Sequence, residues 1–188
     1  MTRGQRRITL AVVGGLVLLR AAGLAQRQPN FSGEWELVEA LVTGATRDGA
    51  ASDQPRRTTS TTISGAPFNC GRGCTIIHKG QTLTIENAQL ADIPGRDKTQ
   101  PTPSMTFHIN GRQMMVVDSF NWDPPLEMPV TARWDGGRIR IDTAQQGAGA
   151  TMLWTQVLSL ESGQLVVVTT STRDGDPGWG TTFSYRKR

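Results

Sequence analysis

The segment VTARWDGGRIRID, residues 130–142, alternates apolar and polar side chains on both sides of a Gly-Gly pair. A two-residue turn at Gly136-Gly137 is typical of a β-hairpin, because glycine adopts the positive φ angles that such turns require. The cross-strand pairs that this turn predicts are Trp134–Ile139, Ala132–Ile141 and Val130–Thr143. The charged side chains then share the opposite face, as expected for a sheet with one buried and one wet face.

The same test predicts three more turns, at Lys79-Gly80, Asn110-Gly111 and Ser162-Gly163. The first turn aligns Ile76 with Leu83. The side chains that the other two turns place on apolar faces are Met105, Phe107, Met114, Val116, Trp154, Leu158, Leu160, Leu165 and Val167, with Gln156 among them. The final strand alternates Phe183 and Tyr185 with polar residues. After residue 30 no segment shows a sustained helical period with caps, so we expect little helix.

These patterns predict an all-β fold in which about 8–10 antiparallel strands follow one another in an up-and-down meander. A meander of this length with one apolar face exposes that face and two edges unless it curls on itself. Closure into a barrel solves both problems. A two-sheet sandwich is the alternative, because the pattern of alternation is the same in both architectures.

The chain begins with features of a secretory signal. Arg3, Arg6 and Arg7 precede an apolar run from Ile8 to Leu19, and small residues follow before a predicted cleavage after Ala25. The run is shorter than the about 20 residues of a spanning helix, so we expect no membrane span once residues 1–25 are removed; an uncleaved anchor is the alternative. The predicted organisation is a signal peptide at 1–25 and one barrel domain at 26–188, exported to the periplasm or the extracellular space.

Removal of this segment changes the charge of the protein. Residues 1–25 hold four arginines and no acidic residue, so the formal net charge falls from +4 to zero. A nucleic-acid-binding surface needs a clustered positive charge, and the mature chain keeps only short basic pairs. We therefore expect no nucleic-acid partner.

Residues 44–69 are rich in Gly, Ala, Ser and Thr and have few large apolar side chains. This composition predicts a flexible connector with one edge strand near 58–63. A lid over the barrel mouth is the alternative.

Cys70 and Cys74 follow this segment directly. In an exported protein two neighbouring cysteines favour a disulfide, and Gly71 and Gly73 let the chain bend tightly enough to form it. A zinc site would need a fourth ligand beyond the two cysteines and His78, so we expect no metal and no cofactor. Both histidines are expected at the surface.

The strand NFSGEWELV carries Gly33-x-Trp35 and resembles the first strand of the calycin group, which includes lipocalins and intracellular fatty-acid-binding proteins. The combination of FSGEW, ARWDGGRIRI, a W-x-x-x-L-S strand and a terminal F-x-Y-R-K-R resembles bacterial secreted lipocalin-like barrel proteins of unassigned activity. The resemblance implies that Trp35 closes the base of the barrel and that Arg186 covers its ring by a cation–π contact. Fatty-acid-binding proteins carry Arg-x-Tyr on the last strand, whereas this chain has Phe183-x-Tyr185.

A barrel of this size can hold a small apolar or amphipathic ligand in its interior. The candidate lining residues are Met105, Phe107, Met114, Trp134, Trp154, Gln156 and Tyr185. The alternative is a protein-binding barrel with a filled core, such as a protease inhibitor or envelope-assembly factor, in which Trp122 and Trp179 on Pro/Gly-rich loops contact the partner. The sequence shows no nucleophile elbow, catalytic triad spacing or phosphate loop, so no catalytic residue is predicted; the oligomeric state is left open.

Overall fold

The computed structural model describes residues 28–45, 51–61, 66–87, 102–118, 126–147 and 149–188. All elements in these ranges are strands. The first six are β1 (Gly33–Ala45), β2 (Ala51–Arg57), β3 (Gly73–Lys79), β4 (Thr82–Glu86), β5 (Ser104–His108) and β6 (Gln113–Asp118). The other five are β7 (Leu126–Asp135), β8 (Arg138–Gly147), β9 (Ala150–Glu161), β10 (Gln164–Arg173) and β11 (Asp176–Lys187). The predicted signal peptide lies outside the described residues.

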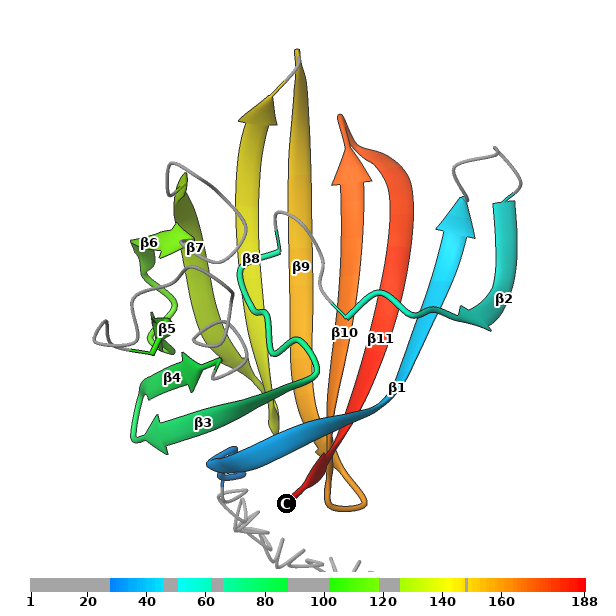
Figure 1. Cartoon of the computed structure of the whole chain (residues 1–188). Helices are drawn as coiled ribbons and strands as arrows, with labels where there is room; N and C mark the ends of the chain where they lie inside the picture. The colour runs from blue at the N-terminus through cyan, green and yellow to red at the C-terminus, as the bar shows by residue number, and fades with distance from the viewer. Residues whose placement is uncertain (1–27, 46–50, 62–65, 88–101, 119–125, 148) are drawn as a thin grey trace, which may run out of the picture.

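The strands form one antiparallel sheet that curls into a nearly closed barrel (Figure 1). Its hydrogen-bonded order is β5-β4-β3-β1-β11-β10-β9-β8-β7-β6, and β2 pairs with β1 outside this path. The first strand joins the last because Trp35 to Thr43 pair with Lys187 to Gly180. This order confirms the predicted up-and-down meander and barrel, and it excludes the two-sheet sandwich.

The hairpin of β7 and β8 has the register that its alternation predicted. Trp134 pairs with Ile139, and the next two predicted pairs follow in step. The turn at Ser162-Gly163 is also confirmed, since Glu161 pairs with Gln164 across it. Ser162 and Gly163 have φ angles of 51° and 80°, as a two-residue hairpin turn requires.

Two predicted hairpins differ from the structure. The turn between β3 and β4 lies at Gly80-Gln81, so Ile76 faces Ile85 instead of Leu83. Gly80 has a φ of 59° and takes the first turn position; the shift by two residues keeps the same side chains on the buried face. The second difference concerns β5 and β6, which were expected to pair around Asn110-Gly111.

The turn at Gly111 joins β5 and β6, but each strand pairs only with its other neighbour, so they form the two ends of the strand order. The backbone N–H of His108 donates to Sδ of Met114 at 3.3 Å across this seam. Gly111 instead donates its N–H to the carbonyl of Ala132 on β7 at 2.9 Å. The turn is therefore used to close the barrel and not to extend a ladder.

The segment predicted as a connector contains a strand and a buried stretch. Ala51–Arg57 forms β2 along the second half of β1, earlier than the edge strand expected near 58–63. Residues 66–71 are all buried. We call residues 66–72 the strap, because Figure 1 shows this part of the chain crossing the sheet before it enters β3. Residues 46–50 and 62–65 lie outside the described ranges.

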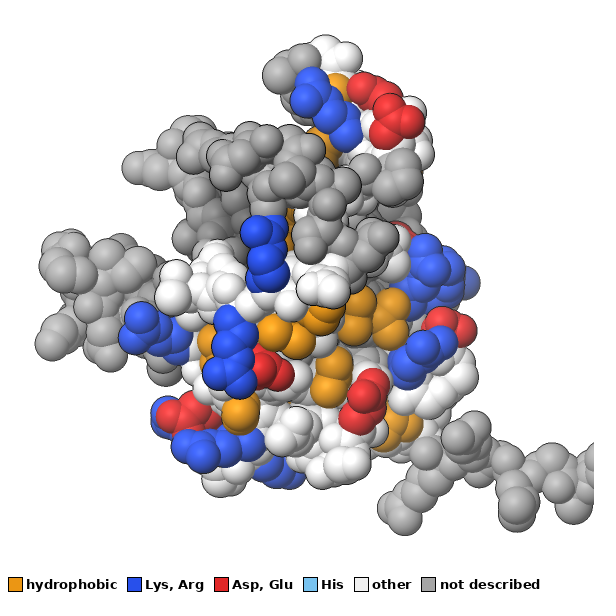
Figure 2. Space-filling view, turned by 90° about the vertical axis from the view of Figure 1, so that its right-hand side faces the viewer, with side chains coloured by type: hydrophobic (Ala, Val, Ile, Leu, Met, Phe, Trp, Pro, Cys, Tyr) orange, Lys and Arg blue, Asp and Glu red, His pale blue; other side chains and the backbone are white. Residues whose placement is uncertain are grey.

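The outer surface mixes both signs of charge. On the side of the barrel seen in Figure 2, Lys and Arg side chains lie beside Asp and Glu side chains, with hydrophobic side chains between them. None of the described segments forms a helix that is long and apolar enough to span a membrane.

Candidate functional site

The inner wall changes from apolar to polar between the base and the mouth of the barrel. The cross-strand register from β7 to β11 defines successive rows of inward side chains. The row near the base contains Trp134, Ile139, Leu158, Val167 and Phe183. The next row contains Ala132, Ile141, Gln156, Thr169 and Thr181. The third contains Val130, Thr143, Trp154 and Ser171. The inner wall therefore offers apolar surface near the base and polar groups nearer the mouth.

Gln156 is the polar centre of this wall. It lies on β9, between inward Trp154 and Leu158, and only 1% of its surface is exposed. Its Oε1 accepts the backbone N–H of Phe68 at 2.6 Å, and its Nε2 donates to the carbonyl of Phe68 at 3.0 Å. Nε2 also donates to Oγ1 of Thr169 at 3.1 Å. The buried amide thus binds both main-chain groups of one residue of the strap.

The far end of the strap is held near the base of the barrel. The phenol of Tyr185 donates to the carbonyl of Gly71 at 3.4 Å. Burial raises the pKa of Tyr185, so the phenol keeps its proton at neutral pH and remains a donor. The backbone N–H of Leu37 donates to the carbonyl of Arg72 at 3.0 Å and connects the strap to β1.

Cys70 and Cys74 form the predicted disulfide, with their Cα atoms 5.0 Å apart. The bend between them depends on Gly71, whose φ is 57° and whose N–H donates to Oδ1 of Asn69 at 3.1 Å. The N–H of Gly73 donates to the carbonyl of Cys70 at 3.0 Å. The disulfide therefore joins the end of the strap to the start of β3, as the sequence predicted.

Trp35 lies at the base of the barrel with 3% of its surface exposed, and its Nε1 donates to the carbonyl of Phe31 at 3.0 Å. Lys187, not the expected Arg186, lies over its ring, with Nζ 5.9 Å from the ring centroid. Trp35 pairs with Lys187 in the β1–β11 ladder, so the two side chains share a face. Arg186 points the other way and forms an ion pair with Glu36 at 2.9 Å.

Gly33 explains the Gly-x-Trp spacing. A Cβ at this position would lie 2.5 Å from Cε of Lys187, and the φ of Gly33 is 153°. The missing side chain leaves room for the lysine stem beside Trp35. This arrangement is structural and belongs to the base of the barrel.

Five of the seven predicted lining residues are buried in the interior. The exposed fractions are at most 6% for Met105, Phe107, Trp154, Gln156 and Tyr185. Met114 and Trp134 are half-buried. The structure places them on one continuous inner wall, and their role in ligand binding stays a prediction.

Trp134 packs in an aromatic cluster at the barrel base. Its ring centroid lies 6.2 Å from that of Phe31 and 5.7 Å from that of His78. His78 was expected at the surface but is half-buried: its Nδ1 accepts the N–H of Phe31 at 3.4 Å, and its Nε2 lies 3.1 Å from the carbonyl of Gly80. The alternation of β3 places it inward, one step beyond Ile76. His108 is exposed, as predicted.

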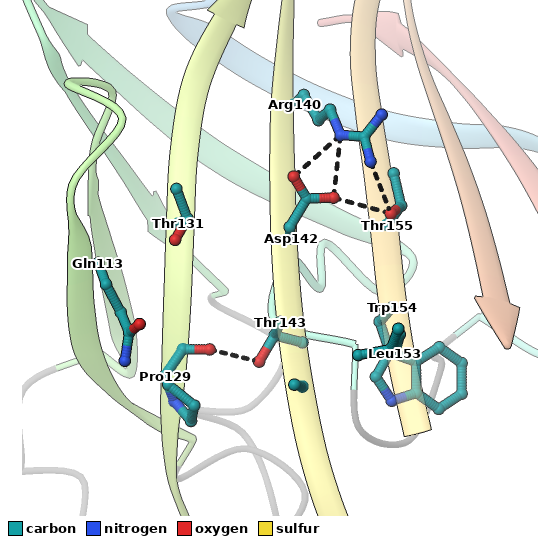
Figure 3. A pocket seen from close by; sticks show the side chains of 10 residues that line it. Gln113, Pro129, Thr131, Arg140, Asp142, Thr143, Leu153, Trp154 and Thr155 are labelled. Atoms are coloured by element: carbon teal, nitrogen blue, oxygen red, sulfur yellow. Dashed lines mark hydrogen bonds and ion pairs between the residues drawn. The ribbon is translucent and has the colours of Figure 1, made fainter. Parts of the chain in front are cut away.

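A hollow lies on the outer wall and has a volume of about 390 Å³ (Figure 3). Asp142 is the acidic residue that lines it. Its carboxylate accepts hydrogen bonds from Nε of Arg140 at 2.9 Å and from Oγ1 of Thr155 at 2.7 Å, and it lies 3.4 Å from the guanidinium of Arg133. Burial alone would raise the pKa of Asp142, but the bonds from Arg140 and Thr155 and the two positive charges hold it below its usual value. Sequence reasoning placed these residues on a charged outer face without predicting a hollow.

Of the two tryptophans proposed as partner contacts, Trp179 is half-buried. Its ring packs edge-on against Trp154, with centroids 5.3 Å apart. Trp122 lies outside the described residues. In the described parts of the chain, no group of three or more His, Cys, Asp or Glu side chains could hold a metal ion.

The fold and the interior define the chain as a nearly closed antiparallel β-barrel with a strap across its interior. No protein-family model matches the chain, and no curated protein sequence matches it. Two solved structures to which the chain is similar are wild-type fluorescent protein UnaG and a point mutant of it. Each is 20% identical, with a TM-score of 0.46, and each alignment covers 84% of this chain and 97% or 96% of that chain.

Proposed function

We propose that this protein is an exported barrel that binds a small apolar or amphipathic molecule in its interior. The observation that carries the proposal is the strap. The wall encloses a stretch of polypeptide in addition to its own inward side chains, so the wall alone does not fill the interior. Small barrels whose wall side chains meet at the centre have no room for such a segment.

The gradient of the inner wall supports an amphipathic ligand. The row that contains Leu158 and Val167 offers only apolar surface, whereas the rows nearer the mouth add an amide and several hydroxyl groups. A ligand with a hydrocarbon body and one polar end matches both parts, because burial of the body is favourable and the polar end finds partners.

The binding experiment uses a pair of filling variants. Purified protein without residues 1–25 is titrated with N-phenyl-1-naphthylamine, which fluoresces in apolar surroundings. Thr143→Phe adds a ring to the inner wall, and Thr131→Phe adds the same ring to the outer wall. We expect the inward variant to weaken dye binding about tenfold or more, and the outward variant to leave it unchanged. Melting curves establish that both variants are folded.

Two results contradict the proposal. One is a wild-type protein that gives no dye fluorescence and that carries no bound molecule in native mass spectrometry after purification from its host. The other is dye binding that Thr131→Phe weakens at least as much as Thr143→Phe does, because Thr131 lines the outer hollow and this result would place the dye outside the barrel.

We also propose that residues 1–25 direct export and are then removed. The disulfide between Cys70 and Cys74 supports export, because such bonds persist in oxidising compartments. N-terminal sequencing of the protein from the medium or periplasm tests the cleavage after Ala25. An intact N-terminus would favour a membrane anchor.

A further inference from the structure

Gln156 binds the strap as one strand binds another. Its amide oxygen and nitrogen are bonded to the N–H and the carbonyl of the same residue, Phe68. These two groups lie on the same side of extended backbone and flank one tetrahedral carbon. A side-chain amide that engages both groups recognises main chain and not a particular side chain.

The orientation of this amide is held by the wall. Oγ1 of Thr169, on the neighbouring strand β10, accepts the second hydrogen of Nε2 at 3.1 Å, and Thr169 is itself fully buried. If the strap leaves, Oε1 and one hydrogen of Nε2 lose their partners in a buried place, while the other hydrogen stays bonded to Thr169; this loss is unfavourable. A molecule that replaces the strap must therefore offer an acceptor and a donor with the same spacing.

The part of the strap that contacts Gln156 lies outside the disulfide loop. Phe68 precedes Cys70, whereas the bond joins Cys70 to Cys74. The contacts of Gly71 with Tyr185 and of Arg72 with β1 also follow Phe68 in the chain. Phe68 can therefore withdraw from the wall while the disulfide end stays in place. Its buried side chain, 4% exposed, leaves apolar space when it does so.

We propose that the strap is an internal competitor for the binding site, and that the ligand which replaces it at Gln156 is an N-acylated amino acid amide. This proposal rests on the proposed function. The N–H and carbonyl of such a molecule flank one carbon, as those of Phe68 do. An apolar side chain takes the place of the Phe68 ring, and the acyl chain contacts the apolar wall.

The experiment compares two probes on the full mature protein by calorimetry. The first is N-octanoyl-phenylalanine amide. The second is the same molecule with a methyl group in place of the hydrogen on the acylated nitrogen, so that it keeps the carbonyl but has no N–H for Oε1. We expect the wild type to bind the first probe about tenfold more tightly, the value of one lost hydrogen bond.

Three variants connect this preference to the strap. Gln156→Met keeps the length of the side chain and should remove the preference. Phe68→Ala weakens the competitor and should tighten binding of the first probe about tenfold. Gln113→Met, on the exposed outer face, should change neither result. If Gln156→Met does not fold, Thr169→Val serves instead, because it removes the hydroxyl that orients the amide and should reduce the preference.

Equal binding of both probes by the wild type overturns the proposal. So does a preference that survives in Gln156→Met, or one that is undiminished in Thr169→Val where that variant replaces it. Unchanged binding by Phe68→Ala overturns the role of the strap as competitor. If N-phenyl-1-naphthylamine binds in the interior while the two probes are not distinguished, the proposed function stands and this inference fails. If neither the dye nor the probes bind, both fail.

Discussion

The hairpin of β7 and β8 and the strap belong to the same barrel, but different interactions determine their conformations. In the hairpin, inward side chains that are buried or half-buried alternate with outward ones, and the backbone groups bond to the neighbouring strand. In the strap six consecutive residues are buried, and the polar groups of its backbone bond to side chains such as Gln156 and Tyr185. Local pattern therefore predicts most of the wall, with the exception of the β3–β4 turn and the pairing of β5 and β6, whereas the strap depends on the wall being formed.

This difference predicts that the strap opens with a lower free energy than the strands of the wall. A wall strand unfolds only with its neighbours, since each ladder bond is shared. The strap makes few main-chain bonds and can leave as a unit, at the cost of its own burial. Regions of this kind open locally with a lower free energy than the whole protein.

The largest expected effect compares two phenylalanines. Phe107 on β5 is fully buried, and Phe107→Ala should lower the free energy of unfolding by about 3–5 kcal/mol. Phe68→Ala removes the same ring from the strap, where the segment can move away, so the global loss should be smaller. Urea unfolding measures both. Hydrogen exchange should show faster exchange in Phe68→Ala confined to the strap and the residues that contact it.

Equal losses of global stability in the two variants would contradict the distinction between wall and strap. So would uniform acceleration of exchange throughout the barrel in Phe68→Ala.

The sequence predicted the wall well because alternation and turn residues are local signals. The faces of β7 to β11 and the pairs around Gly136-Gly137 depend on nothing beyond the strands themselves. Residues 66–69 of the strap were predicted as the end of a flexible connector, because they show neither the period of a strand nor that of a helix. Their burial depends on Gln156, which lies 88 residues further along the chain. The contact of Lys187 with Trp35 was not predicted for a related reason: it depends on the register between the first and last strands, which are far apart in the sequence.

The disulfide should contribute next, because it limits the freedom of the strap. Replacement of both cysteines, Cys70→Ser with Cys74→Ser, should lower the free energy of unfolding by about 2 kcal/mol. The effect is small because a short disulfide loop restricts the unfolded chain only a little. Reduction of the wild type should give a similar shift in the midpoint of urea unfolding. The double variant is the control, since a reductant should have no effect on it. A loss as large as that of Phe107→Ala would mean that the strap is needed for the wall to fold.

On the outer wall, Asp142→Asn should destabilise the protein by about 1–2 kcal/mol at neutral pH, because a charged acceptor for Arg140 and Thr155 is lost. The pKa of Asp142 is lowered in the folded state. Its contribution is therefore complete above the unfolded pKa of about 4 and disappears as the pH falls through the folded pKa. The melting temperatures of wild type and variant, measured from pH 7 downward, should converge in acid. A constant difference across this range would show that the carboxylate charge is not responsible.

The smallest expected effect separates the two cations that follow Tyr185. Lys187→Met removes the charge 5.9 Å from the Trp35 ring and should cost about 0.5–1 kcal/mol. Arg186→Met breaks an exposed ion pair with Glu36, and such pairs contribute little to stability and weaken in salt. Only the lysine variant should shift the Trp35 fluorescence. A fluorescence shift caused by Arg186→Met alone would mean that the register of the final strand differs by one residue, so that Arg186 and not Lys187 shares the face of Trp35.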